Sequence, residues 1–298
     1  MVNKTYPFVT IVIPIIGYKN IPHYLLKSII AIKYPKEKFE VIFVKLRSQP
    51  IKFSLPGIKT IVVNSGKIIG YSEAVNVGAK KAKRELIFLI NPDIRLDRNS
   101  LIELVDYYSI NPAVGVTGPV VFTLGSPNNL SPYDLPVRFN KQFGRMTPLS
   151  TKKIKSLKSP YEVDWLSGCA LLFSKDVWSK LDGFEEKLFI YWEDADFCMR
   201  AKEKGLHIVL IPSARVWHQG SAYMKSQNSK LYYLVRNVNF FSHRHTGLLG
   251  KIFLHGNNLL LIIIKILRFV LQPAKRQESY VYLCGVFDFY RGRMGKKA

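Results

Sequence analysis

Long apolar runs alternate with stretches of helical periodicity over the first ninety residues of the chain. The apolar runs, which are rich in β-branched residues, predict strands buried on both faces at residues 8–16, 39–46, 59–64 and 85–90. Between them, apolar or small residues recur at helical spacing in residues 21–35, where Pro35 ends the pattern, and in residues 72–83. This alternation predicts an α/β fold with a mostly parallel central sheet flanked by helices.

The pattern is weaker in the middle of the chain. Residues 141–160 hold six Lys or Arg and no acid, with Gly, Pro and Ser scattered among them, and this composition predicts a mobile basic loop. Beyond it, strand character is expected at residues 163–174 and 206–218, and helices are expected at residues 175–184 and 193–205.

The C-terminal region, residues 225–298, is basic and partly apolar, with thirteen basic and two acidic residues and a net charge of +11. Residues 257–272 are strongly apolar, but Asn257, Asn258, Lys265 and Arg268 leave no clean run of about 18 residues, so we do not expect a membrane-spanning helix. Two alternatives stay open. The segment is either a helix packed against the protein core or a helix that lies in a membrane interface, with Lys265 and Arg268 along one narrow side.

The charge of the whole chain is lopsided. Its formal net charge of +23 predicts anionic binding partners, such as nucleic acid, an anionic membrane surface or phosphorylated substrates. A general bias toward basic residues would also produce this charge. The cysteines Cys169, Cys198 and Cys284 lie too far apart in the sequence to suggest a disulfide framework or a CxxC metal site. Because no signal peptide is recognisable at the N-terminus, we expect a cytoplasmic protein.

Candidate functional side chains occur at three places in the sequence. Asp93 directly follows a predicted strand, where ligands of open α/β sheets bind, and His218 ends a later strand. Glu193, Asp194 and Asp196 stand inside an aromatic run, where like charges and poor solvation disfavour them unless a cation or proton compensates. Each feature alone has a simpler interpretation, as a turn residue, a strand-end histidine or acids at a helix N-terminus. Together they suggest a divalent cation that carries phosphate oxygens, with carboxylates left to act as a base.

Several blocks of the sequence carry a family resemblance. They are VTIVIP, GYSEAVNVGAKKAKRELIFLINPD, the long stretch DWLSGCALLFSKDVWSKLDGFEEKLFIYWEDADFCMRAKEKG, IPSARVWHQGSA and YYLVRNVNFF. In these blocks the chain resembles the family 2 glycosyltransferases of the GT-A fold, in the branch that includes rhamnosyltransferases. The resemblance covers nearly the whole chain.

The resemblance implies roles for individual residues. NPD, ending in Asp93, stands where the family has its DxD metal motif, and His218 matches the histidine that completes the metal site. The implied cofactor is a divalent cation, Mn²⁺ or Mg²⁺, that binds the diphosphate of the sugar nucleotide. Asp194 matches the carboxylate that acts as general base on the acceptor hydroxyl, with Glu193 beside it as a second catalytic residue.

The same resemblance implies two sets of binding residues. Those for the nucleotide sugar are Pro14, Lys45, Gly70, Asn76, Gly78, Asn91 and Asp93. Those for the acceptor are Trp165, Gly168, Trp192 and Glu193. Two positions depart from the family pattern: Lys45 stands where an acid usually recognises the nucleobase, and Asn91 replaces the first Asp of DxD.

The implied activity is metal-dependent, inverting transfer of a sugar from a nucleoside-diphosphate donor to a hydroxyl of a glycan or lipid-linked acceptor. The implied division is a GT-A domain over residues 1–224, with a nucleotide-binding half (1–110) and an acceptor half (111–224), followed by a helical region (225–298). We expect the protein to lie peripherally on the cytoplasmic face of a membrane. A catalytically impaired scaffold of the same fold is an alternative. A nucleic-acid-binding protein is a weaker one, because no nucleic-acid motif is recognisable and the acidic cluster would have no role.

Overall fold

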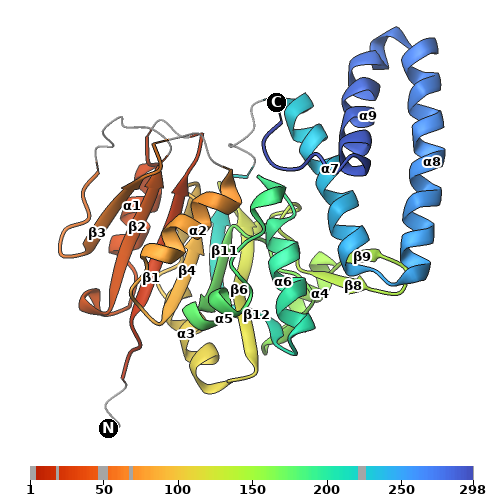
Figure 1. Cartoon of the computed structure of the whole chain (residues 1–298). Helices are drawn as coiled ribbons and strands as arrows, with labels where there is room; N and C mark the ends of the chain where they lie inside the picture. Colours follow the sequence, from red (N-terminus) through yellow and green to blue (C-terminus); the bar gives the residue numbers. More distant parts are fainter. Residues whose placement is uncertain (1–4, 18–19, 46–52, 67–69, 221–225, 298) are drawn as a thin grey trace.

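A computed structural model describes residues 5–17, 20–45, 53–66, 70–220 and 226–297 (Figure 1). Its centre is a ten-stranded sheet in the order β10-β12-β6-β11-β4-β1-β2-β3, with β5 paired to β12 and β7 paired to β6. The strands are β1 (Val9–Ile15), β2 (Phe39–Lys45), β3 (Lys59–Asn64), β4 (Leu86–Ile90), β5 (Ile94–Leu96), β6 (Val114–Thr123), β7 (Ser126–Leu130), β10 (Tyr161–Val163), β11 (Ala170–Ser174) and β12 (His207–His218).

The sheet is mixed but mostly parallel along its length. β1 runs parallel to both β2 and β4, β2 is parallel to β3, and β12 is parallel to β6. β11 lies antiparallel between β4 and β6, and so joins the two parallel groups into one sheet. The predicted fold class is therefore confirmed, and the strands expected in the first ninety residues are present.

Helices cover both faces of the sheet. The sheet's two apolar layers explain this, because alternate residues of β1 point to opposite faces: Ile11 and Ile13 belong to one core cluster and Val12 to the other. The helices that follow in the chain are α1 (His23–Ile30), α2 (Tyr71–Lys81), α3 (Ser100–Ile110), α5 (Lys175–Lys180) and α6 (Glu193–Glu203). α1 and α3 pack in the first cluster, and α2, α5 and α6 pack in the second.

Residues 141–160 are not the structureless loop that their composition predicted. β8 (Val137–Asn140) and β9 (Arg145–Pro148) pair as an antiparallel hairpin, and α4 (Thr151–Ser156) follows it. The side chain of Ser150 caps α4 by accepting a hydrogen bond from the backbone N–H of Lys153, and Ile154 is buried. A hairpin and a short helix therefore form in this region despite its many basic residues.

The chain ends in three helices, α7 (Gln227–His245), α8 (Leu248–Leu271) and α9 (Arg276–Tyr290). Figure 1 shows α8 and α9 side by side as a hairpin that projects beyond the sheet, with α7 between them and the α/β layers. Short 3₁₀ turns also occur at Lys36–Lys38, Glu186–Leu188 and Pro273–Lys275. The expected domain boundary at residue 224 lies outside the described residues and stays a prediction.

The structure bears on both expectations for the apolar C-terminal segment. By length and composition alone α8 could cross a membrane, because Lys265 and Arg268 are the only charged residues in its apolar half, and the expectation that it does not span one stays a prediction. Of the two alternatives left open, the buried packing helix does not fit, since only 11% of its most apolar stretch is buried. The residues of α8 that are buried are Gly250, Asn258 and Lys265. Asn258 and Lys265 therefore face inward, while many apolar side chains of the helix face outward.

Candidate active site

A pocket of about 380 Å³ opens where several strands end. Pro14 near the end of β1, Asn91 after β4 and His218 at the end of β12 all reach it, as expected for ligand sites of α/β sheets. Residues of the loop before β11 and of the turn into α6 complete its lining. Nine of the predicted site residues line this pocket, namely Pro14, Asn91, Asp93, Trp165, Gly168, Trp192, Glu193, Asp194 and His218.

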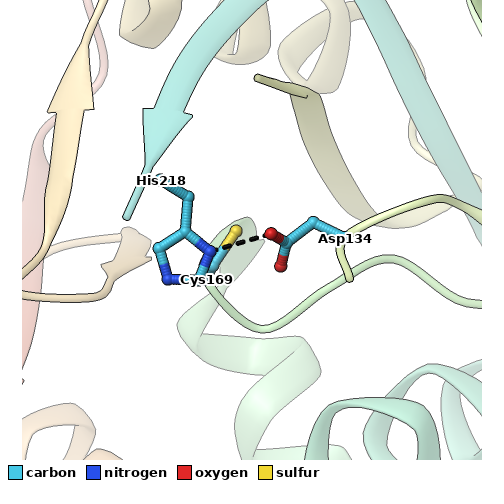
Figure 2. A group of neighbouring side chains, drawn as sticks. All are labelled: Asp134, Cys169 and His218. Carbon is cyan, nitrogen blue, oxygen red and sulfur yellow. Dashed lines mark hydrogen bonds and ion pairs between the residues drawn. The ribbon is translucent and has the colours of Figure 1, made fainter. Parts of the chain in front are cut away.

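The imidazole of His218 lies between two carboxylates. Its Nε2 is 3.3 Å from Oδ1 of Asp93, and its Nδ1 is 2.8 Å from Oδ2 of Asp134. Burial disfavours the charged imidazolium, but Cys169, Asp134 and Asp93 outweigh it and raise the pKa of His218 well above its ordinary value. The sulfur of Cys169 completes this cluster, in which the ligand atoms of Asp134, Cys169 and His218 lie within 4.8 Å of one another (Figure 2).

Glu193 and Asp194 occupy the first turn of α6 and differ in environment. Glu193 is buried, and its Oε2 has no hydrogen-bond partner among the described residues. Asp194 is partly exposed and accepts hydrogen bonds from the backbone N–H groups of Gly168 (2.6 Å) and Ala195 (2.8 Å). Burial and the neighbouring Asp194 raise the pKa of Glu193 well above its ordinary value. Burial also raises the pKa of Asp194, although its two backbone hydrogen bonds oppose the rise.

The third acid of the cluster, Asp196, has a structural role. It is fully buried outside the pocket, and its carboxylate pairs with Arg200 at 2.7 Å and with His245 at 2.9 Å. Burial disfavours its charge, but His245 and Arg200 hold the pKa of Asp196 below its ordinary value. Asp196 therefore anchors α6 to α7, while the two preceding acids face the pocket.

The backbone of the turn into α6 is strained, and hydrogen bonds from α7 hold it in place. Phe189, Tyr191 and Trp192 have φ angles of 63°, 67° and 75°, a region that favours glycine. The amide of Asn237 on α7 donates to the carbonyl groups of Leu188, Ile190 and Tyr191, at 2.7–3.0 Å. Backbone strain of this kind persists only where surrounding structure fixes it, and it gathers at functional sites. Here it sets the position of Trp192 and of the two acids that follow.

A match to a known family agrees with this geometry. The family described as "Glycosyltransferase like family 2" matches residues 7–240, most of the chain. The chain belongs to glycosyltransferase family 2.

Individual relatives are more distant. The N-acetylglucosaminyl-diphospho-decaprenol L-rhamnosyltransferase of Mycobacterium tuberculosis is 27% identical over 54% of this chain and 56% of its own length. The low-salt glycan biosynthesis hexosyltransferase Agl10 of Haloferax volcanii is 26% identical over 49% of this chain and 47% of its own length. This family 2 chain thus spans about half the length of the curated relatives it matches.

Two solved structures share the fold over nearly the whole chain. The mannosyltransferase PcManGT of Pyrobaculum calidifontis, in complex with GDP-Man and Mn²⁺, gives a TM-score of 0.57 at 15% identity over 97% of this chain and 88% of its own. TarS of S. aureus (residues 1–349), in complex with UDP-GlcNAc, gives 0.58 at 16% identity over 95% and 81%. At such low identity these likenesses show the fold alone.

The divalent cation that the family resemblance implies fits the side chains of this pocket. Among the residues that the structure describes, four carboxylates line it, against one histidine and one lysine, so a cation would relieve the repulsion among the acids. Asp93 and His218 offer an oxygen and a nitrogen only 3.3 Å apart, a donor pair that suits Mn²⁺. Asn91 stands beside them, and its Oδ1 accepts a hydrogen bond of 2.7 Å from the hydroxyl of Tyr71.

The other four predicted nucleotide-binding residues lie outside the lining of this pocket. Both ends of the Asn76 amide are bound to the backbone of Phe184, at 2.8 Å each. A Cβ at Gly78 would lie 2.4 Å from Val12, so this glycine lets α2 pack on β1. These contacts favour structural roles for Asn76 and Gly78. Gly70 sits against Phe189, and Lys45 ends β2. Their roles toward the nucleotide stay predictions.

Three residues of the pocket were missed by sequence reasoning. Asp134 stands in a stretch without clear periodicity, and nothing near it in the sequence points to His218, 84 residues away. Cys169 was noticed only as a cysteine without a nearby partner. Tyr71 could have been found, because it lies within one of the blocks that carry the family resemblance. Its hydroxyl lies 2.7 Å from Oδ1 of Asn91 and 3.2 Å from the carbonyl oxygen of Gly168.

Proposed function

We propose that this family 2 chain is a metal-dependent, inverting glycosyltransferase. It moves a sugar from a nucleoside-diphosphate donor to a hydroxyl of a glycan or lipid-linked acceptor. The observation that carries the proposal is that Asp93 and His218 line the same pocket as Glu193 and Asp194. A cation site and a base site would then border one space, where donor and acceptor would meet.

The donor half of the reaction uses the strand ends. Asp93 and His218 would hold a divalent cation, which when bound supplies positive charge for the leaving diphosphate. Asn91 and Pro14 would border the nucleotide. The solved relatives carry different nucleotides, GDP-Man in PcManGT and UDP-GlcNAc in TarS, so the fold does not choose between them. A screen of nucleotide sugars with Mn²⁺, Mg²⁺ or EDTA tests the donor half.

The acceptor half uses α6 and the loop before β11. Asp194 accepts the proton of the acceptor hydroxyl, and its raised pKa brings it closer to the working pH, where general bases are most effective. The rings of Trp165 and Trp192 lie 5.4 Å apart and would support a sugar, with Gly168 and Glu193 beside them. A single base with no enzyme nucleophile implies direct displacement, and therefore inversion at the anomeric carbon.

A catalytically impaired scaffold of the same fold is the competing proposal. It is motivated by Asn91, whose Oδ1 is already engaged by Tyr71, and by Lys45 in place of an acid. Asp93, His218 and Asp194 all line the pocket, which favours an active enzyme. Transfer or hydrolysis of any donor sugar in the screen would exclude the scaffold, whereas nucleotide binding without turnover would support it. We expect no binding of nucleic acid.

We further propose that α8 places the enzyme on an anionic membrane surface, on the cytoplasmic side. Two polar side chains of α8 are satisfied inside the helical region: Lys265 pairs with Glu278 of α9 at 2.8 Å, and Asn258 donates to Asn239 of α7. The outward side chains are apolar and exposed, namely Leu248, Leu249, Ile252, Phe253, Leu259, Leu260, Ile263, Ile266, Leu267, Phe269, Val270 and Leu271. We call these residues the apolar face of α8.

Two features indicate lipid as the partner of the apolar face. A helix that satisfies its polar groups inside and exposes apolar ones has the reverse of the pattern expected in water, and exposed apolar surfaces of this extent mark interaction sites. The surrounding region, residues 225–298, carries a net charge of +11, which anionic headgroups would neutralise. A lipid-linked acceptor, like that of the mycobacterial relative, would be found at such a surface.

A further inference from the structure

Asp134 lies behind the predicted metal ligand His218 and is held firmly. Its Oδ1 accepts a hydrogen bond of 2.5 Å from the hydroxyl of Ser167, and its Oδ2 accepts one of 2.5 Å from the hydroxyl of Ser131. The same Oδ2 lies 2.8 Å from Nδ1 of His218. Asp134, His218 and Asp93 are all buried. Both oxygens of Asp134 are therefore engaged by protein groups, which leaves it poorly placed to bind a cation itself.

The other nitrogen of His218 faces the opposite way. Nε2 lies 3.3 Å from Oδ1 of Asp93 and 3.5 Å from Nδ2 of Asn91. Because the hydroxyl of Tyr71 lies 2.7 Å from Oδ1 of Asn91, the Asn91 amide presents its NH₂ group to His218. Nδ1 lies closer to its carboxylate than Nε2 does, at 2.8 Å from Asp134 against 3.3 Å from Asp93. When a cation replaces the proton on Nε2, the proton that remains is the one on Nδ1, which is hydrogen-bonded to Asp134.

We propose that Asp134 is a positioning residue for the metal site. It accepts a hydrogen bond from Nδ1–H of His218, fixes the tautomer and the ring plane, and so leaves Nε2, which faces Asp93, to bind the cation. Histidines that bind metals commonly donate their second ring N–H to a carboxylate, and loss of that partner typically costs about 10- to 100-fold in metal affinity. The inference rests on the proposed metal dependence. Figure 2 shows the Asp134 carboxylate pointing at the His218 ring, with Cys169 beside it.

Cys169 offers the competing explanation of the same cluster. With Asp134 and His218 it could itself hold a thiophilic ion such as Zn²⁺, because the three ligand atoms lie within 4.8 Å of one another. Burial raises the pKa of the Cys169 thiol to about 11, so the thiol is neutral here unless an ion binds it. If Asp134 acts through His218, the sulfur is dispensable for binding of Mn²⁺, and this difference can be measured.

The test is the affinity of the full chain for Mn²⁺ without donor sugar, measured by calorimetry on Mn²⁺ alone and with saturating UDP or GDP. We expect Asp134→Asn to weaken binding about 10-fold and Asp134→Ala up to about 100-fold. Ser167→Ala, which removes one support of Asp134, should cost a few-fold. Cys169→Ser, a matched change in the same cluster, should stay within about twofold of the wild type. Thermal unfolding shows that each variant is folded.

A double-mutant cycle separates positioning from a general structural role. In a His218→Ala background, adding Asp134→Asn should produce no further loss of Mn²⁺ affinity. An undiminished loss there, or wild-type affinity in both Asp134 variants, would overturn the inference while the proposed function stands. A loss in Cys169→Ser as large as that in Asp134→Ala would also overturn it, in favour of an ion held by the sulfur. A wild type that binds no Mn²⁺ under any of the three conditions would overturn the proposed metal dependence itself, and the inference with it.

Discussion

The backbone N–H of Gly168 donates a hydrogen bond of 2.6 Å to Oδ2 of Asp194. The bond ties the loop before β11 to the first turn of α6, and a Cβ added at Gly168 would lie only 2.9 Å from the Cβ of Asp194. The proposed base is thus held by a contact that a side chain at position 168 would disturb.

We therefore expect Gly168→Ala to lower turnover by about 10- to 100-fold, because a displacement on the order of 1 Å of a catalytic group has effects of this size. The affinity for donor should change little, since the donor contacts belong to the strand ends. Gly256→Ala is the matched control, because a Cβ at Gly256 meets no atom within 4 Å in the part of the chain that the structure describes. Steady-state kinetics measure turnover and calorimetry measures donor affinity. Normal turnover in Gly168→Ala would show that the contact between Gly168 and Asp194 does not position the base.

Asp194→Asn should be the most damaging change in the acceptor half. The amide keeps the size of the side chain but cannot accept the hydroxyl proton, and loss of a general base typically costs on the order of 10²–10⁴-fold in rate. Glu193→Gln should cost less, because Glu193 is buried with a raised pKa and is poorly suited to accept a proton. Near-normal turnover in Asp194→Asn would show that the base is assigned wrongly, as would a product that retains the donor's anomeric configuration by NMR.

Removal of the metal should stop the donor half of the reaction. We expect donor hydrolysis to be lost in excess EDTA and to return with Mn²⁺ or Mg²⁺. Asp93→Ala should abolish most of it, and His218→Ala should raise the metal concentration needed for half-maximal rate without unfolding the chain. Full activity in EDTA would contradict the proposal, and an unchanged metal titration in His218→Ala would remove that residue from the site.

The sequence predicts the sheet, and the strand ends that border the pocket, better than it predicts the contacts that hold the site residues in place. The strands around Pro14 and Asn91 follow from local apolar runs, and the ends of such strands converge in any parallel sheet. The contact between Asp134 and His218 has no local signal, because it depends on β7 folding back along β6 and on a histidine far along the chain. The orientation of α8 also depends on a non-local contact, because Lys265 faces inward where it pairs with Glu278 of α9.

Glu193→Gln should stabilise the fold at neutral pH. The pKa of Glu193 is raised in the folded state above its ordinary value of 4.5, so its charge opposes folding once the pH exceeds that value. Below about pH 4.5 both states hold the proton and the variant gains nothing; the gain appears as the pH rises and is complete above the folded-state pKa. Thermal unfolding from pH 4 to 8 measures it, with roughly 2–4 °C expected per kcal/mol. A gain that is equal at all pH values would point to packing instead of charge.

The apolar face of α8 should bind vesicles that contain anionic lipid. We expect the full chain to co-sediment with phosphatidylglycerol vesicles more than with neutral phosphatidylcholine vesicles, and the difference should shrink as salt rises. Ile263→Glu with Leu267→Glu removes two exposed apolar side chains from one side of the helix. Each contributes roughly 1.5–3 kcal/mol if fully buried in lipid, so binding should fall at least tenfold.

Ile110→Glu is the matched control for that experiment, because Ile110 is 78% exposed at the end of α3 on the α/β domain. It should leave vesicle binding unchanged. Equal binding to neutral and anionic vesicles would remove the electrostatic part of the proposal. Failure to bind either vesicle, together with a concentration-dependent dimer in light scattering that Ile263→Glu with Leu267→Glu abolishes, would assign the apolar face to a second copy of the chain. Lipid binding that survives both α8 substitutions would place the membrane contact on another surface.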